Sequence, residues 1–527
     1  MKEYREEIQE DSLILIVSDE MNQILRANLY EVGLNEKELK RLRIRKRELR
    51  EALNNCGIGD AQAKLYVKNV IEDILVNKLK YGEESWNRII PFQENNRLSS
   101  RDKFDILMYC YEEKYGCQAF ERFISENNIL EKISKEDQGY CMDQKMIEDI
   151  FFEKAEVLSA EDKKKIIVQR LYAGYRGLGV VDQLRDFRID GISGGVSGKE
   201  GEYNSVWVFF HGITMHLKFL SFQTERELER VCMNIYRYGN PGQLSKTKGY
   251  IVNEMKDHSR VVVVRPPFSE SFAFFVRKFD TMERKEMEEL ITDPGNEIVI
   301  EHLKWIVKGC QITAVTGAQG TGKTTLLMGL IAYIHPAFTL RIQEMAFELH
   351  LRDTYPERNI LSFRETDTIS GQEGLDLQKK TDGVVNILGE VASIEVAAYL
   401  IQMSQVGSLF TLFTHHAKTT ESLVKYMRNS LLSSGLFRNE KIAREQVVDS
   451  IRFDVHLEKD IKGHRYVERI SEIVPQETEK GYSVVDIVKY ENGRYVQTGR
   501  FSDDVIRDMR KRMTESDKEE FGEKYNL

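Results

Sequence analysis

Short apolar runs alternate with longer apolar stretches from residue 301 to about residue 475. The short, β-branched runs predict buried strands over residues 311–316, 339–343, 382–390 and 407–414. The longer stretches predict helices over residues 325–334 and 394–403, the first of them ending at a proline. Such alternation is typical of a parallel sheet that helices cover on both faces, so we predict an α/β fold for this region.

The region before residue 286 shows a different pattern. A helix predicted over residues 163–172 is followed by short strands and by a second helix over residues 225–238. The predicted strands are residues 190–193, 205–210, 216–219, 260–264 and 273–276. This pattern indicates a small α+β domain.

Four regions are expected in the 527 residues, in keeping with a length that suits two to four domains. Residues 1–160 are predicted to be mostly helical, with one short strand over residues 13–17, and no activity is assigned to them. The other regions are the α+β domain 161–285, the α/β domain 286–480 and the C-terminal segment 481–527.

Residues 317–324, Gly-Ala-Gln-Gly-Thr-Gly-Lys-Thr, match the phosphate-loop pattern G-x-x-x-x-G-K-[ST] at every fixed position. The motif lies between a predicted strand and a predicted helix, which is the context that it needs. Glycines allow successive backbone N–H groups to curl around a phosphate, and the start of the helix adds partial positive charge. We therefore predict that the chain binds a nucleoside triphosphate. The alternative is a glycine-rich turn without a ligand.

The motif also suggests roles for single side chains. Lys323 is expected to reach the β- and γ-phosphates, and the hydroxyl of Thr324 is expected to bind Mg²⁺. The expected nucleotide-binding residues are Gly317, Gln319, Gly320, Thr321, Gly322, Lys323, Thr324 and Thr325.

Glu344, Glu390 and His416 each lie at the end of a predicted strand. In open α/β sheets the active site lies at the carboxyl ends of the strands, so these side chains are expected near the phosphate loop. Glu390 suits the acid that holds Mg²⁺ through water, and Glu344 suits the base that activates water. His416, with His415 before it, suits a sensor of the γ-phosphate. For each of them the alternative is an ordinary strand-end residue.

Composition narrows the function classes. The net charge of −9 gives no overall basic field for nucleic acid. Six cysteines without a C-x-x-C pair favour free thiols in a reducing cytosol over disulfides or a zinc site. The charged start lacks the apolar core of a signal peptide, and no apolar run approaches the roughly 20 residues of a membrane span. We therefore expect a cytoplasmic protein.

A basic run occupies residues 37–47. Such a run suits contact with anionic lipid or nucleic acid. Glutamates at positions 36, 38, 48 and 51 flank it, so the alternative is a solvated helix face.

Six stretches carry a family resemblance. They are the "GLG" residues 175–180, the "RV…RPP…RKF" residues of 260–279, residues 343–349, 387–390 and 407–417, and residues 482–499. These resemble, in order, the entry motif, the N-domain motif, the Asp box, the Walker B strand, the His box and the C-terminal hairpin of the type II/type IV secretion superfamily of ATPases. The branch most similar is the motor of the Flp-type (tight-adherence) pilus. The resemblance runs from about residue 160 to residue 512.

The resemblance implies a RecA-like core with a smaller α+β amino-terminal domain and a C-terminal hairpin. It also implies a homo-hexamer that hydrolyses ATP with Mg²⁺ and drives an inner-membrane platform protein of a pilus or secretion machine, without nucleic acid. Such a motor works at the cytoplasmic face of the inner membrane. Arg277 and Arg265 would approach the nucleotide from the smaller domain and supply positive charge. The alternative is that both are ordinary surface arginines.

Four positions depart from the family pattern. Met345 and Val384 stand where the Asp box and the Walker B strand usually have Asp, and Ala392 and Asp367 stand where arginines are usual. These changes leave the phosphate loop intact and bear on the rate of hydrolysis. Two alternatives stay open: a RecA-like NTPase that acts on nucleic acid, and a nucleotide-gated binding subunit with little hydrolysis.

Overall fold

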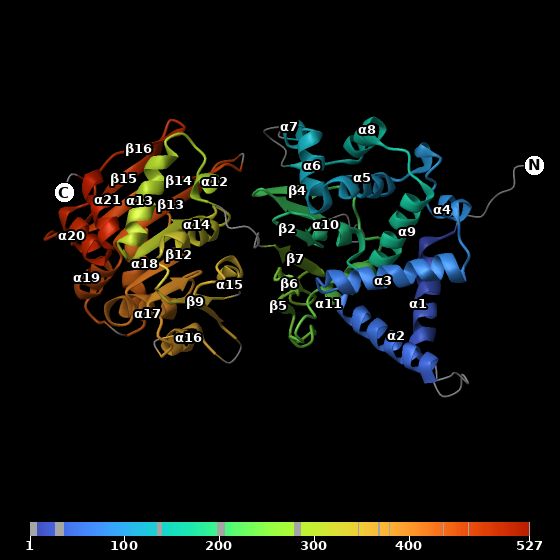
Figure 1. The fold of residues 1–527 in the computed structure, drawn as a ribbon, viewed down its shortest axis with the longest axis horizontal. Coiled ribbons are helices and arrows are strands. Elements are labelled where there is room, and N and C mark those ends of the chain that lie inside the picture. Colours follow the sequence, from blue (N-terminus) through green and yellow to red (C-terminus); the bar gives the residue numbers. More distant parts are fainter. Residues whose placement is uncertain are drawn as a thin grey trace, which may run out of the picture. The chain divides into compact units, whose positions relative to one another are not determined.

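The structure is a computed structural model, and it describes residues 8–26, 36–133, 140–197, 206–278, 286–345, 347–366, 369–378, 380–435, 437–461 and 463–525. The chain forms two compact units, Met1–Phe279 and Asp280–Leu527, which we describe one at a time (Figure 1). The finer division at residues 160 and 480 stays a prediction.

The first unit begins with a mostly helical region. Its helices are α1 (Glu10–Arg26), α2 (Glu36–Asn55), α3 (Ala61–Asp73), α4 (Glu83–Ile89), α5 (Ser100–Tyr115), α6 (Ala119–Glu126), α7 (Ile129–Ile133), α8 (Gln144–Lys154), α9 (Ala160–Tyr175), α10 (Asp182–Asp186) and α11 (Glu225–Ile235). Capping boxes define two of these starts, because Ser99 and Asp102 at α5, and Ser159 and Asp162 at α9, exchange side-chain and backbone hydrogen bonds.

The strand predicted over residues 13–17 is wrong, because this segment lies inside α1. Leu13, Val17 and Met21 are fully buried, whereas Leu15 and Ile16 are exposed. The buried residues recur every four positions, which is the spacing of one helix face, and the apolar run Leu-Ile-Leu-Ile-Val hides this period.

The sheet of the first unit has the order β1-β4-β3-β2-β7-β6-β5 and is antiparallel except for the pair β1 and β4. Its strands are β1 (Cys141–Met142), β2 (Gly191–Gly194), β3 (Trp207–Phe210), β4 (Ile213–Leu217), β5 (Tyr250–Glu254), β6 (Arg260–Val264) and β7 (Ala273–Arg277). The five predicted strands are present, although β4 covers residues 213–217 where residues 216–219 were predicted, and the edge strands β1 and β5 are additional.

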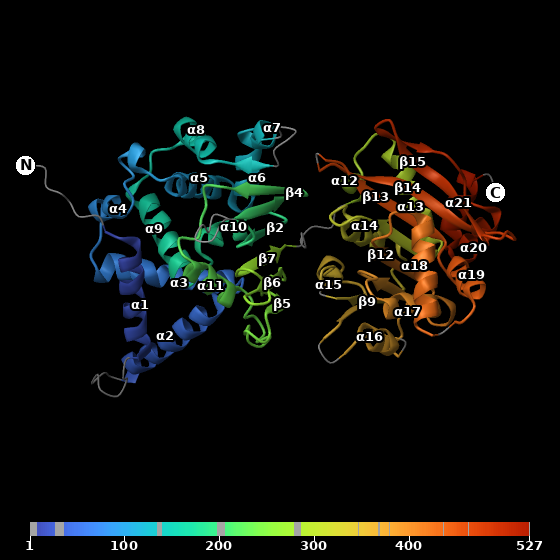
Figure 2. The same ribbon diagram turned by 180° about the vertical axis from the view of Figure 1, so that it is seen from behind.

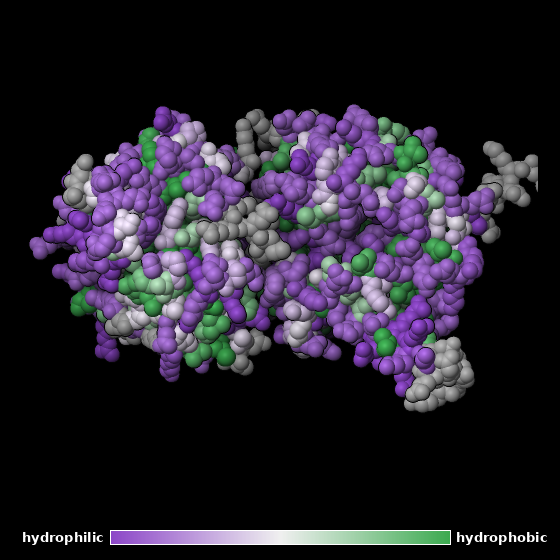
Figure 3. All heavy atoms as spheres, in the orientation of Figure 1, coloured by the Kyte–Doolittle hydropathy of each residue, from purple (hydrophilic) through white to green (hydrophobic). Residues whose placement is uncertain are grey.

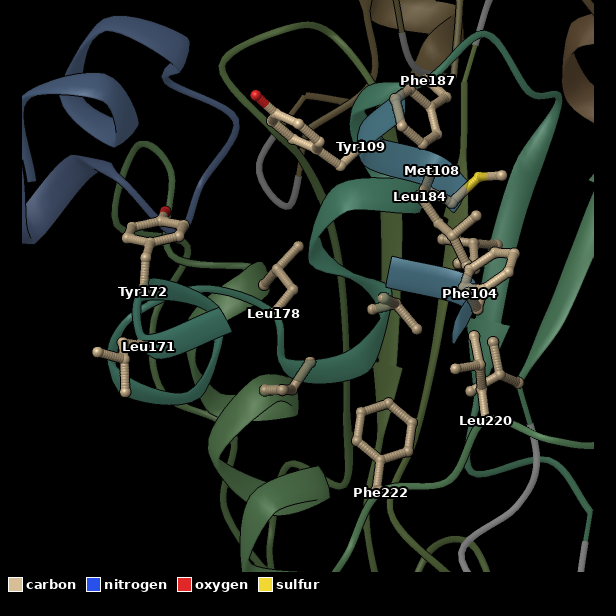
Figure 4. Close-up of a cluster of buried hydrophobic side chains, with 14 of the residues drawn as sticks. Phe104, Met108, Tyr109, Leu171, Tyr172, Leu178, Leu184, Phe187, Leu220 and Phe222 are labelled. Atoms are coloured by element: carbon tan, nitrogen blue, oxygen red, sulfur yellow. The ribbon is translucent and has the colours of Figure 1, made fainter. Parts of the chain in front are cut away.

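The helices and the sheet of this unit share one hydrophobic cluster, which extends from Leu13 to Val276. Figure 4 shows Phe104 and Met108 of α5 in the same cluster as Leu220 and Phe222, which follow β4. A partly buried ionic contact adds to this packing, since Lys64 of α3 donates to Asp182 at 2.5 Å and to Asp186 at 2.6 Å. Burial alone would raise the pKa of Asp186, but Lys64 and Arg185 lower it to about 2.

The second unit is a nine-stranded sheet with helices on both faces (Figure 2). Its strands are β8 (Thr313–Gly317), β9 (Leu340–Glu344), β10 (Ile360–Arg364), β11 (Val385–Leu388), β12 (Phe410–His415), β13 (Phe453–Lys459), β14 (Arg465–Pro475), β15 (Tyr482–Glu491) and β16 (Arg494–Gln497). Its helices are α12 (Met287–Leu290), α13 (Asn296–Lys308), α14 (Lys323–Leu330), α15 (Leu351–Thr354), α16 (Gly371–Gln378), α17 (Ile394–Val406), α18 (Thr420–Ser433), α19 (Glu440–Ser450), α20 (Asp503–Arg512) and α21 (Glu515–Tyr525).

The strand order is β10-β9-β11-β12-β8-β13-β14-β15-β16, parallel as far as β13 and antiparallel beyond it. Two hydrophobic clusters cover its two faces: Val315 of β8 belongs to one and its neighbour Ala314 to the other. The predicted α/β fold class, with a RecA-like phosphate-loop core and a smaller α+β part before it, is therefore confirmed. The parallel order brings the carboxyl ends of β9, β11, β12 and β8 to one edge.

Within the residues that the structure describes, no helix combines the length and the apolar character that crossing a membrane requires.

Candidate functional site

The phosphate loop connects β8 to α14, as predicted. Gly317, Gly320 and Gly322 have φ values of 142°, 78° and 95°, which L side chains rarely adopt. A Cβ atom on Gly317 would lie only 2.3 Å from the carbonyl oxygen of Leu457 in the neighbouring strand β13. The loop therefore needs glycine for its backbone path, and this path presents the start of α14 as an anion cradle that fits a triphosphate tail.

Lys323 is buried at the first position of α14. Its ammonium group donates to the carbonyl oxygens of Gly317 and Ala318, at 2.9 Å and 2.8 Å. The hydroxyl of Thr321 donates to the carbonyl oxygen of Ala318 at 3.0 Å. Lys323 is thus held over the loop, at the place from which it can contact a phosphate.

His416 links Lys323 to Glu390. Its Nδ1 lies 3.4 Å from the ammonium nitrogen of Lys323, and its Nε2 lies 3.1 Å from Oε1 of Glu390. An ammonium group only donates, so Nδ1 accepts and Nε2–H donates to the carboxylate. The structure therefore brings three of the predicted site residues into one continuous chain of polar contacts.

The backbone explains why Glu390 and His416 meet. β11 and β12 are parallel neighbours, and both lead into this edge of the sheet. Thr414 binds both residues that flank Glu390: its hydroxyl donates to the carbonyl oxygen of Gly389 at 2.5 Å, and its carbonyl accepts from the N–H of Val391 at 3.0 Å. These two bonds fix the segment of Glu390 against the segment of His416.

Glu344 lies elsewhere on the same edge. Its strand, β9, is three inter-strand spacings from β8, or about 14 Å. Its buried carboxylate accepts from the backbone N–H groups of Glu348 and Leu349, both at 2.9 Å. A Cβ on Gly389 would lie 3.0 Å from the Cγ atom of Glu344, so the side chain packs beside the residue that precedes Glu390. Its role as a base stays a prediction.

His415 is buried and does not belong to the contact chain of Lys323, His416 and Glu390. Its Nδ1 accepts from the backbone N–H of Ala417 at 3.0 Å. Burial, with smaller contributions from His416 and Lys323, lowers the pKa of His415 to about 4. This histidine is therefore neutral at pH 7 and supports the backbone next to His416.

A buried polar network lies beneath the loop and ties β8 to β13. Thr316 donates to Oδ1 of Asp454 at 2.5 Å, and Thr420 donates to Oδ2 of the same carboxylate at 2.7 Å. Because the one hydroxyl proton of Thr316 is used in this way, Nδ1 of His456, 2.8 Å from the same oxygen, must donate to it. The network holds the residue that precedes Gly317. No sequence motif predicted this network.

Two cations that the sequence analysis missed lie beside the loop. A Cβ on Gly320 would lie 3.7 Å from Nζ of Lys459, and a Cβ on Gly322 would lie 3.7 Å from Cδ of Arg465. Lys459 ends β13, Arg465 begins β14, and the two residues are partners in the strand register. Lys459 and Arg465 lie more than 130 residues after the motif, and only the pairing of the strands brings them to the loop. No local pattern in the sequence predicts this proximity.

The other predicted site residues do not belong to the contact chain of Lys323, His416 and Glu390. Thr324 is half-buried and Thr325 exposed in the first turn of α14, and Gln319 is exposed at the crest of the loop. Arg277 is the exposed last residue of β7, and the Nε of Arg265 donates to the carbonyl of Pro266 at 3.2 Å. Both arginines belong to the first unit, whereas the loop belongs to the second. Asp367 lies outside the described residues.

Comparisons with known proteins give a likeness of fold at low identity. No protein-family model matches the chain, and no curated protein matches it. The solved structures similar to it include the VirB11 ATPase of the Brucella suis type IV secretion system with sulphate, the Legionella pneumophila ATPase DotB, and the pilus retraction motor PilT with bound ADP.

The VirB11 match has 16% identity and a TM-score of 0.30, and covers 54% of this chain and 89% of that one. The DotB match has 15% identity and a TM-score of 0.40, and covers 64% and 83%. The PilT match has 14% identity and a TM-score of 0.38, and covers 62% and 83%. All three TM-scores lie below 0.5, so the activities of these proteins are not transferred to this chain.

Proposed function

We propose that the chain binds ATP at residues 317–325 and hydrolyses it. The observation that carries this proposal is the contact chain from Lys323 through His416 to Glu390 beside a glycine loop with the required backbone path. A turn that only connects a strand to a helix does not require a buried lysine in contact with a histidine and a glutamate from the ends of two other strands.

The residues divide the chemistry as follows. Loop N–H groups and Lys323 neutralise the β- and γ-phosphates. Thr324, and Glu390 through water, would hold Mg²⁺, which would supply further positive charge. Water attacks the γ-phosphorus, a new P–O bond forms, and the bond to the bridging oxygen breaks. We assign the water proton to Glu390 in place of Glu344, because Glu390 lies in the contact chain with Lys323, whereas the strand of Glu344 is three inter-strand spacings from β8.

We further propose that hydrolysis drives a pilus-assembly or secretion motor of the type II/type IV secretion class, closest to the Flp-type pilus motor. The motif resemblance over residues 160–512 supports this proposal. In such a motor a homo-hexamer places Arg277, and with it Arg265, at a nucleotide site. The ring acts on an inner-membrane platform protein from the cytoplasmic face and needs no nucleic acid.

A second candidate is a nucleotide-gated subunit with little hydrolysis. The engaged carboxylate of Glu344 favours it, together with the exposed Met345 at the position where the family usually has Asp. Both candidates predict that the chain binds ATP. Only the motor is expected to release phosphate at a sustained rate.

Binding and assembly are tested with the full chain and with Lys323→Ala. We expect wild-type protein to bind ATP by calorimetry, Lys323→Ala to lose at least a hundredfold in affinity, and sedimentation to give a mass near six subunits. Equal affinity in both proteins would overturn the proposed site. A monomer with and without ATP would overturn the motor and leave the binding site standing.

A further inference from the structure

The first half of α2 is largely surrounded by solvent. Residues 37, 40–45, 47 and 48 are exposed, so the described side chains of this part of the helix form no buried face. The buried residues Leu49, Ala52 and Leu53 all lie in the second half, which packs on the rest of the unit. Figure 1 shows α2 at the periphery of the first unit.

Residues 37–50 are strongly basic, whereas the whole chain is acidic. Residues 37–50 contain eight Lys or Arg and two Glu, a net charge of +6 in a chain of net charge −9. Lys37 and Arg41 are four positions apart, and like charges at this spacing destabilise a helix. Arg45 is bound to Asp73 of α3 at 3.0 Å. The net charge of the segment therefore complements an anionic surface.

Aliphatic side chains are exposed in the same part of the unit. Leu42 and Ile44 lie between the basic residues of α2, and Leu15 and Ile16 lie on the neighbouring helix α1, with exposed fractions from 36% to 66%. Figure 3 shows isolated hydrophobic side chains within the predominantly hydrophilic surface of this unit. Basic residues around exposed aliphatic ones are the pattern of helices that lie in a membrane interface.

We propose that residues 37–50 of α2, with Leu42 and Ile44, dock on an anionic lipid surface. Lipid fits better than nucleic acid, because aliphatic side chains insert among acyl chains but do not stack on bases, and α2 contains no aromatic residue. This surface belongs to the first unit and the phosphate loop to the second, and the proposal does not depend on nucleotide hydrolysis.

The test uses the full chain without nucleotide and vesicles of phosphatidylcholine with 30% phosphatidylglycerol, against vesicles of phosphatidylcholine alone. The variant K40Q/R41Q/R47Q/R50Q removes four exposed cations from α2. The control R494Q/R500Q/R510Q/R512Q removes four exposed cations from the second unit and changes the net charge equally. Circular dichroism and melting temperature establish that each variant is folded.

We expect wild type and control to float with the anionic vesicles only. Each Lys or Arg near such a surface contributes about fivefold to partitioning, so the α2 variant is expected to lose at least a hundredfold. The variant L42S/I44S keeps every charge and is expected to lose about tenfold. Equal flotation of the α2 variant and the control would overturn the proposal. So would salt-sensitive binding of single-stranded DNA by a wild-type chain that does not bind the vesicles.

Discussion

Nε2 of His416 lies 3.1 Å from Oε1 of Glu390, and the opposite nitrogen of the same ring faces Lys323. Replacing His416 with Ala breaks this chain and leaves the glycine loop and Lys323 in place. We expect kcat for ATP to fall by about 10²–10³, because Glu390, to which we assign the water proton, loses the N–H group that orients its carboxylate, with Kd changed less than fivefold. Phosphate release and calorimetry measure the two quantities. A kcat within threefold of wild type would remove His416 from the mechanism.

Gly317 tests whether the loop needs its observed backbone. In Gly317→Ala, the new Cβ meets the carbonyl oxygen of Leu457 at 2.3 Å, at a φ of 142°. We expect a loss of about 2–4 kcal/mol in the free energy of unfolding, from strain and displaced backbone together.

Gly493→Ala is the matched control. Gly493 also has a positive φ, 78°, but no atom lies within 4 Å of its Cβ position. We expect it to lose about 1 kcal/mol. Chemical denaturation followed by fluorescence compares the two, and equal losses would show that the contact with Leu457 does not constrain the loop.

His415 predicts a pH dependence of stability. Its pKa is about 4 in the folded chain, below the ordinary value of 6.5, so the unfolded chain binds the proton more readily between these pH values. Stability is therefore full above pH 6.5 and falls as the pH drops toward 4, by an amount on the order of 3 kcal/mol. His415→Asn keeps an acceptor for the N–H of Ala417 without titrating. The difference between the two stability profiles isolates this histidine, and parallel profiles would contradict the assignment.

Lys459 and Arg465 predict a contribution to nucleotide affinity from the β13–β14 hairpin. Both lie next to glycines of the phosphate loop. We expect Lys459→Ala and Arg465→Ala each to weaken ATP binding about five- to twentyfold by calorimetry, because each removes a cation close to the phosphates. Arg494→Ala, an exposed cation on the edge strand β16, serves as the control. Unchanged affinity in all three variants would limit the two residues to a structural role.

The sequence predicted the phosphate loop and the strands around it because the motif and its flanks are local. It also predicted that strand ends would gather polar residues, and the parallel order of β11, β12 and β8 brings Glu390, His416 and Lys323 together. The sequence alone does not decide whether Glu344 or Glu390 takes the proton from water. The two backbone N–H groups that bind Glu344 depend on the turn after β9, which no motif predicts.

Other features depend on packing between distant segments. The apolar run 13–17 resembles a strand until its burial on one face of α1 is known. Lys459 and Arg465 reach the loop only because β13 pairs with β8 and the next strand folds back on it. No local sequence pattern shows which strands pair when they are far apart in the chain.

The most direct test of the central claim is steady-state phosphate release by the wild-type chain and by Glu390→Gln, at saturating ATP and Mg²⁺. The glutamine side chain keeps an oxygen that can accept from Nε2 of His416, but it cannot take a proton from water. The proposed mechanism predicts sustained turnover by the wild type and at least a hundredfold loss in the variant, with ATP affinity retained. Identical background rates in the two proteins would contradict it.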